Sequence, residues 1–185
     1  ISHGIPEEAI TYLNPQDSNT PSLNPLLGPV EEVAEMLTQV IAGLDDSGSG
    51  GNFFFAQAQR SHLKQHVYLL KLHDPEKTPT FGVLVKMYNN PGLVHEMHMA
   101  LKQRLLTQSV PADRDSQHLA EIMEELDKWF DDCIVPATAK GRGGPTLYDS
   151  STGKQVFVDS KAEHVQGLRN ILNDMSTNTG LRRVL

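Results

Sequence analysis

Several kinds of residue and segment are scarce in this 185-residue sequence, and each scarcity argues against a class of protein. Cys133 is the only cysteine, so an internal disulfide is excluded and a reducing compartment is expected, either the cytoplasm or the cytosol of a host cell. Sixteen basic residues against 23 acidic ones give a net charge of −7, which disfavours nucleic acid and anionic membranes as partners. No run of about 18 apolar residues occurs, so no membrane span is expected.

The chain is long enough for one domain whose core needs neither a metal nor a disulfide. We interpret residues 1–28 as a proline-rich arm, which is either a linker or an extension docked on the domain. Residues 29–176 are expected to form a single domain, and residues 177–185 a tail. The chain begins at Ile1 rather than Met, which favours a fragment or a processed product.

Apolar residues recur at helical spacing in four segments. The first helix is expected to begin after Gly28-Pro29, and the second after residues 90–92. The third covers about 116–132. The last begins at Ser160, where Glu163 follows three residues later and predicts a capping box.

Other segments have the composition of β-strands. Residues 66–73 and 81–88 are rich in Val, Leu and Tyr and are separated by turn residues, so they predict adjacent antiparallel strands. Residues 143–159 predict two more short strands around a polar turn closed by Gly153. A strand at 53–55 completes the set. The order predicts an α+β fold, with an antiparallel or mixed sheet of about five strands packed against four helices on one face.

Two histidines, His95 and His98, are the candidate metal ligands. The segment lacks the His-Glu-x-x-His pattern of zinc proteases, because Met99 stands where the second histidine is required. The two imidazoles still share a helix face at a spacing of three residues. His62 and His66 have a similar spacing, but they lie where a strand is expected to begin. No third ligand is evident in either case, so we expect a polar surface and no cofactor.

Cys133 and Asp149 are the candidate catalytic residues. Intracellular cysteine hydrolases pair a lone cysteine with His and Asp or Asn. Cys133, however, falls near the C-terminus of an expected helix, where the helix dipole disfavours a thiolate, so a buried core role is preferred. Leu147-Tyr148-Asp149, with Gly153 and Phe157, resembles the catalytic Asp turn of papain-like cysteine proteases secreted by bacterial pathogens. That resemblance implies a catalytic Asp149, but the family's upstream cysteine and preceding histidine are missing.

The incomplete catalytic set favours a binding protein over an enzyme. The predicted order of helices and strands, with the closing hairpin at 147–158, resembles the class I chaperones of bacterial type III secretion. An extra helix at about 116–132 and the proline-rich arm depart from that family. The resemblance implies a noncatalytic protein-interaction domain, chaperone-like or part of an effector, with another protein as partner and a homodimer as one form. The alternative is a papain-like, hydrolase-like effector domain that is degenerate or has a different His/Asp site.

Overall fold

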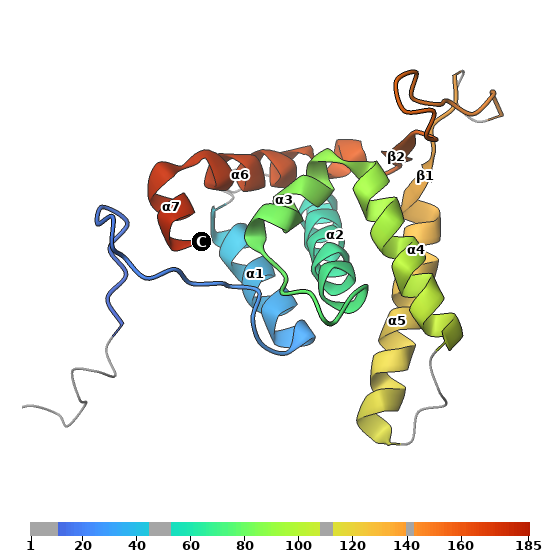
Figure 1. The fold of residues 1–185 in the computed structure, drawn as a ribbon. Helices are drawn as coiled ribbons and strands as arrows, with labels where there is room; N and C mark the ends of the chain where they lie inside the picture. Colours follow the sequence, from blue (N-terminus) through green and yellow to red (C-terminus); the bar gives the residue numbers. More distant parts are fainter. Residues whose placement is uncertain (1–10, 45–52, 108–112, 140–142) are drawn as a thin grey trace, which may run out of the picture.

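The computed structural model describes residues 11–44, 53–107, 113–139 and 143–185, and within these ranges the chain is mainly helical (Figure 1). The described residues contain seven α-helices, one 3₁₀ helix and two short strands. In chain order they are α1 (Val30–Leu44), α2 (Phe53–Leu72), α3 (Phe81–Asn89), α4 (Pro91–Thr107), α5 (Arg114–Cys133), β1 (Ile134–Pro136), β2 (Phe157–Asp159), η2 (Ala162–Val165), α6 (Gln166–Thr177) and α7 (Thr179–Val184). In the described part of the chain, no helix combines the length and the apolar character that crossing a membrane requires.

The predicted α+β fold with a five-stranded sheet is wrong. The sheet of the described residues has two strands, β1 and β2, which pair antiparallel with Val135 opposite Val158. The segments 66–73 and 81–88, which were expected to be strands, lie in or directly after α2 and in α3. The expected strand at 53–55 is the beginning of α2.

The misassigned segments look like strands because the helices that contain them are buried on more than one side. Four consecutive residues of α2, from Val67 to Leu70, are all buried. A continuous apolar run of this length is typical of a buried strand and of a buried helix alike. Helix α3 then begins at a local signal, because the Thr80 side chain accepts a hydrogen bond from the Val83 amide.

The helices predicted from amphipathic spacing are confirmed. Helices α1, α4 and α5 cover the first three predicted segments, and α6 covers the C-terminal part of the last, because it begins at Gln166 and not at Ser160. The predicted capping box at Ser160 does not form. Its hydroxyl donates to the carbonyl of Asp132, and η2 intervenes before α6, whose N-cap position is Val165.

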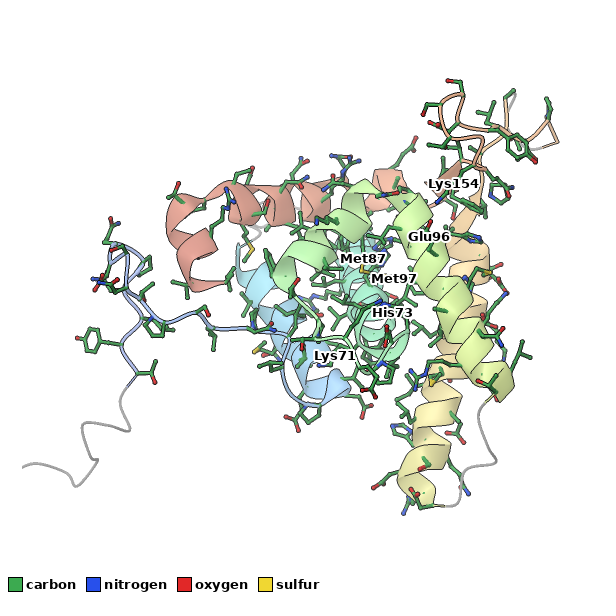
Figure 2. All side chains as sticks on the ribbon, in the orientation of Figure 1. Lys71, His73, Met87, Glu96, Met97 and Lys154 are labelled. Atoms are coloured by element: carbon green, nitrogen blue, oxygen red, sulfur yellow. The ribbon has the colours of Figure 1, made fainter. Side chains whose placement is uncertain are left out.

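Helix α2 lies at the centre of the fold and contacts α1, α3, α4, α5 and η2 (Figure 1). Helices α4 and α5 pack against each other, and the two-stranded sheet continues from the C-terminal end of α5. The side chains between these helices form one apolar core, drawn as sticks in Figure 2. The sheet therefore sits at one end of a helical bundle and does not form a layer of its own.

The end of the proline-rich arm is attached to this bundle. Leu26 is fully buried, and its carbonyl accepts a hydrogen bond from the ammonium of Lys71 on α2. The Asn24 side chain donates to the carbonyl of Pro79 at 2.8 Å, and the Leu23 amide donates to the carbonyl of Val184 in α7. These contacts hold residues 23–26 against the connection between α2 and α3 and against the last helix.

We predict that Leu69→Ala on α2 lowers the free energy of unfolding by about 2–5 kcal/mol, because the removed side chain is fully buried and leaves a cavity. Chemical denaturation followed by circular dichroism measures the change. Leu106→Ala is the matched control, because Leu106 on α4 is 81% exposed and its loss should change stability by no more than about 0.5 kcal/mol. Equal losses in the two variants would contradict the central position of α2.

Candidate functional site

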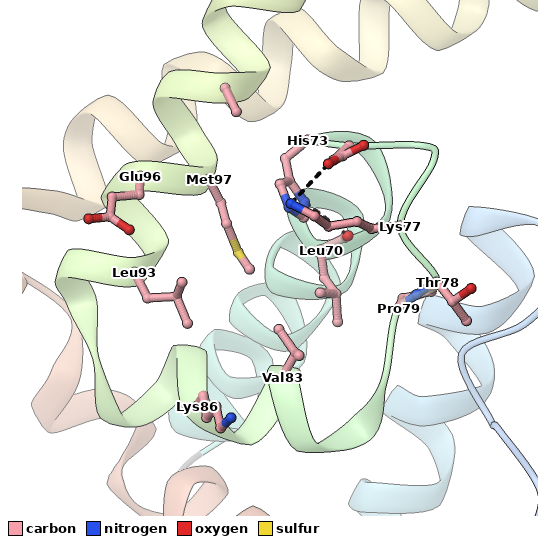
Figure 3. A pocket seen from close by; sticks show the side chains of 12 residues that line it. Leu70, His73, Lys77, Thr78, Pro79, Val83, Lys86, Leu93, Glu96 and Met97 are labelled. Atoms are coloured by element: carbon pink, nitrogen blue, oxygen red, sulfur yellow. Dashed lines mark hydrogen bonds and ion pairs between the residues drawn. The ribbon is translucent and has the colours of Figure 1, made fainter.

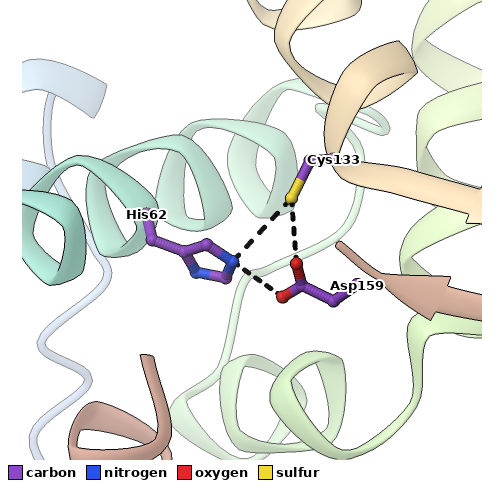
Figure 4. A group of neighbouring side chains, drawn as sticks. All are labelled: His62, Cys133 and Asp159. Carbon is purple, nitrogen blue, oxygen red and sulfur yellow. Dashed lines mark hydrogen bonds and ion pairs between the residues drawn. The ribbon is translucent and has the colours of Figure 1, made fainter. Parts of the chain in front are cut away.

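Three reactive side chains meet where α2, α5 and the sheet converge. Cys133 is the last residue of α5, Asp159 is the last residue of β2, and His62 projects from α2 (Figure 4). Because Ile134 pairs with Asp159 across the sheet, the register sets the carboxylate beside the preceding cysteine. The Cys133 thiol donates to Asp159 Oδ1 at 3.2 Å, and His62 Nε2 lies 2.8 Å from Asp159 Oδ2 and 3.9 Å from Cys133 Sγ.

The hydrogen bonds of this cluster define how its protons are arranged. His62 is 1% exposed, and its Nδ1 lies 3.1 Å from the hydroxyl of Tyr88 on α3. Because the Asp159 carboxylate can only accept, a neutral His62 has its proton on Nε2 and accepts the Tyr88 hydroxyl proton at Nδ1. The Lys161 amide also donates to Asp159 Oδ1, at 2.8 Å. The network is thus internally satisfied, as a buried polar group requires.

Aromatic rings enclose the imidazole of this cluster. The His66 ring stacks on that of His62 with 4.1 Å between their centroids. Trp129 lies edge-on to His62 at 5.4 Å, and the Lys161 ammonium lies 4.3 Å from the centroid of the Trp129 ring. These contacts restrict the orientation of the His62 ring.

The electrostatics of the cluster disfavour a nucleophilic cysteine. Burial, together with the charge and hydrogen bond of Asp159, raises the pKa of the Cys133 thiol well above its ordinary value. Burial and Asp159 likewise raise the pKa of Tyr88. Burial also opposes ionisation of Asp159, but the hydrogen bonds that the carboxylate accepts from His62, the Lys161 amide and the Cys133 thiol outweigh it and hold the pKa of this carboxyl at about 2. Reactive cysteines have the opposite shift, a lowered pKa beside a cation.

The geometry of the cluster also differs from that of a catalytic triad. In a triad, one imidazole nitrogen faces the nucleophile and the other faces the carboxylate. Here the same nitrogen, Nε2 of His62, faces both Cys133 and Asp159, and the other nitrogen faces Tyr88. The carboxylate therefore competes with the thiol for the nitrogen that would have to act as a base.

Asp149, the other candidate catalytic residue, lies in an exposed turn of the hairpin. Its Oδ1 accepts hydrogen bonds from the amides and hydroxyls of Ser151 and Thr152. These hydrogen bonds hold the pKa of Asp149 at about 2. Gly153 closes the turn with a φ of 66°, a conformation that glycine adopts without strain. This arrangement is that of a carboxylate that stabilises a turn.

The two candidate metal ligands on α4 face different partners. The His95 ring stacks on Phe157 of β2 with 3.7 Å between centroids, and burial, with the nearby His98, lowers its pKa. His98 is buried, and its Nε2 lies 2.6 Å from Asp127 Oδ1 on α5. The structure therefore brings His98 together with Asp127 and does not bring it together with His95 as a pair of ligands.

His98 belongs to a second group of potential ligands, with Asp127 and Asp131. The ammonium of Lys102 already lies among these carboxylates, 2.6 Å from Asp131 Oδ1 and 3.6 Å from Asp127 Oδ1. The hydrogen bond to Asp131 raises the pKa of Lys102 most, and the charges of Asp127 and Asp131 raise it further. The Lys102 ammonium therefore stays charged. A lysine thus occupies the position that a metal cation would need.

A separate feature is a pocket of about 500 Å³ between α2, α3 and α4 (Figure 3). Leu70 of α2, Val83 of α3, and Leu93 and Met97 of α4 project toward it. His73, directly after α2, also lines it and bonds through Nδ1 to the Leu69 carbonyl one turn earlier. The pocket thus has apolar walls, with polar groups along the connection between α2 and α3 and at Lys86 of α3 and Glu96 of α4.

Comparison of the chain with models of protein families, with curated proteins and with solved structures finds no match.

Cys133 is a candidate from the sequence, but its two partners in the structure, His62 and Asp159, are not among the predicted catalytic residues. The sequence places His62 with His66 at the start of an expected strand, and no pattern in it marks Asp159. The signal that could have found His62 is its spacing of four residues from His66 together with apolar residues at helical spacing, which becomes visible once residues 53–72 are treated as a helix. The pairing of Asp159 with Cys133 depends on the register of the sheet.

We predict that Cys133 in the folded protein reacts with iodoacetamide at least about 100-fold more slowly than in the denatured protein, because the thiol is buried and its pKa is raised. Mass spectrometry of samples quenched over time gives both rates, and the single cysteine makes the readout unambiguous. Similar rates in the two states would contradict the position of Cys133 and restore it as a candidate nucleophile.

Proposed function

We propose that this chain is a noncatalytic protein-interaction domain, which accommodates a short apolar and acidic segment of a partner protein in the pocket between α2, α3 and α4. The observation that carries the proposal is the composition of that pocket, whose walls are apolar and whose rim has a lysine, Lys86, that forms no ion pair with the residues the structure describes.

The pocket walls favour an apolar side chain of the partner. Val83 and Leu93 are only partly buried in the chain alone, and both face the pocket (Figure 3). Filling the pocket removes this apolar surface from water, and burying one Leu-sized or Phe-sized side chain contributes roughly 1.5–3 kcal/mol. Met97 adds a flexible side chain that adapts to the shape of its partner.

The charges at the rim favour a carboxylate next to that apolar side chain. Lys77 forms an ion pair with Asp74 at 3.1 Å. Glu96 forms one with Lys154 at 3.3 Å, and both of these residues are labelled in Figure 2. Lys86 is exposed and forms no ion pair with any residue that the structure describes. A carboxylate of the partner that reaches Lys86 would therefore supply the missing counter-charge and set the orientation of the segment.

The alternatives from the sequence have less support. The resemblance to class I secretion chaperones depends on an order of strands that the two-stranded sheet does not provide, so this proposal does not include that family. A hydrolase needs an activated nucleophile, and Cys133 is buried beside a carboxylate that raises its pKa. A homodimer stays an alternative occupant of the same pocket and is an outcome of the test below.

We predict that random peptides displayed on phage and selected on the 185-residue protein converge on an apolar residue next to Asp or Glu. Lys86→Glu should weaken binding of the selected peptides at least about tenfold, or about 1.4 kcal/mol, because it replaces an attraction with a repulsion. Fluorescence polarisation with labelled peptides measures the dissociation constants.

Lys128→Glu on α5 is the matched control, because it makes the same change of charge at an exposed position that does not line the pocket. Equal effects of the two variants would show that net charge and not the pocket governs binding. Failure to enrich any peptide would refute a peptide-binding pocket. Sedimentation equilibrium tests for a homodimer. If the chain forms a dimer and Lys86→Glu dissociates it, a second copy of the chain is the occupant of the pocket.

A further inference from the structure

We propose that His62, Cys133 and Asp159 bind a divalent transition-metal ion, with zinc as the best match. This site is separate from the pocket of the proposed function and does not depend on it. The three residues supply one imidazole nitrogen, one thiolate sulfur and one carboxylate oxygen, which are the donor types found in zinc sites. A borderline-soft ion suits this mixed set better than Mg²⁺ or Ca²⁺, which prefer oxygen ligands alone.

The distances between the donor atoms fit one shared ion. Zinc lies about 2.0–2.3 Å from nitrogen, oxygen and sulfur ligands, so donors in a tetrahedral site are roughly 3.3–3.7 Å apart. The observed distances lie on both sides of that range. They are 2.8 Å from His62 Nε2 to Asp159 Oδ2, 3.2 Å from Cys133 Sγ to Asp159 Oδ1, and 3.9 Å from Cys133 Sγ to His62 Nε2. Small side-chain rotations are enough to equalise them.

The backbone holds the three donors in place without the metal. Cys133 and Asp159 are linked by the register of the sheet, and the Ser160 amide donates to the Cys133 carbonyl at 2.8 Å. His62 lies on the central helix α2. Three elements far apart in the sequence thus converge on one point, as expected of a site that is formed by folding.

The partners of the donors also suit a metal site. On binding, the thiol proton leaves to solvent and the Cys133 sulfur forms the bond to the metal. The Nε2 lone pair of His62 binds the metal, and the proton of the neutral imidazole is then on Nδ1, where it donates to the Tyr88 hydroxyl oxygen. A metal-binding histidine commonly has such a partner for its other nitrogen. The Lys161 amide orients the Asp159 carboxylate in the same way.

Three protein ligands leave a fourth position for water or another ligand. The Asp159 side chain is 14% exposed, whereas that of His62 is 1% exposed, so the carboxylate marks the side from which an ion can enter. The group formed by His98, Asp127 and Asp131 offers no such position, because the Lys102 ammonium already pairs with both carboxylates.

The test uses the 185-residue chain, stripped with a chelator and titrated with Co²⁺ as an optical probe. We expect one Co²⁺ per chain, with the charge-transfer absorption of a cobalt–thiolate bond, and displacement by one equivalent of Zn²⁺. Because Cys133 is the only cysteine, this absorption can arise only from the proposed site. Trp129 is the only tryptophan and lies 5.4 Å from His62, so quenching of its fluorescence gives a second readout.

Variants then separate the ligands from their surroundings. Cys133→Ser, His62→Gln and Asp159→Asn should each weaken Co²⁺ binding by more than about 100-fold, and Tyr88→Phe by about 10- to 100-fold, the range for a partner that orients a ligand. His98→Gln is the matched control, because it makes the same change at the other histidine–aspartate pair and should leave the affinity unchanged. Circular dichroism verifies that each variant is folded.

The titration of the wild-type protein decides the proposal even where a variant fails to fold. Absence of stoichiometric uptake, or uptake without the thiolate absorption, would overturn it. Retention of wild-type affinity in a folded Cys133→Ser or His62→Gln protein would overturn it as well.

Discussion

The fold depends on how the buried histidines of the central helix find hydrogen-bond partners within the protein. His62 and His66 on α2 and His73 directly after it are buried, and a buried polar group without a hydrogen bond costs roughly 1–3 kcal/mol. His66 and His73 each bond through Nδ1 to a carbonyl one turn earlier. His62 instead has partners on other elements, Tyr88 of α3 and Asp159 of β2, so satisfying it ties those elements to α2.

The same constraint accounts for a sheet that is too small to be stable alone. Strands β1 and β2 have three residues each, and an isolated two-stranded pair is marginal in water. Here Asp159 at the end of β2 bonds to His62, and Phe157 at its beginning stacks on His95 of α4. Both ends of β2 are thus held by helices, and the sheet is stabilised by its attachment to the bundle.

The part of the fold that could be predicted from the sequence is the part with one buried face. Helices α1, α4 and α5 each contact the core along one side, so their apolar residues recur at helical spacing. Helix α2 contacts helices on several sides, and its run of four buried residues from Val67 to Leu70 hides the helical period. A strand assignment for 66–73 then favours a partner strand at 81–88, so the misreading of α2 accounts for two of the five predicted strands, and the predicted strand at 53–55 is the beginning of the same helix.

The candidate site could be predicted only in part, for a different reason. Cys133 stands out as the only cysteine, and its place at the end of α5 follows from the amphipathic pattern. Its partners His62 and Asp159 are 71 and 26 residues away in the sequence. Contacts at such separations depend on the packing of α2 against α5 and on the register of a three-residue sheet. Neither of these leaves a local pattern in the sequence.

The two candidate sites lie far enough apart along α2 that a change at one is not expected to alter the binding free energy at the other. His62 and the pocket residue Leu70 are eight positions apart, which corresponds to roughly 12 Å along the helix axis. Changes at sites more than about 7–10 Å apart that share no partner usually add without interaction. The partners of His62 are on α3, α5 and β2, whereas the pocket is lined by the connection after α2 and by other residues of α3 and α4. A conservative change at the Cys133 cluster is therefore expected to leave the pocket intact, and a loss of peptide binding in a folded His62 variant would point to coupling through the contacts between β2 and α4, where Phe157 stacks on His95.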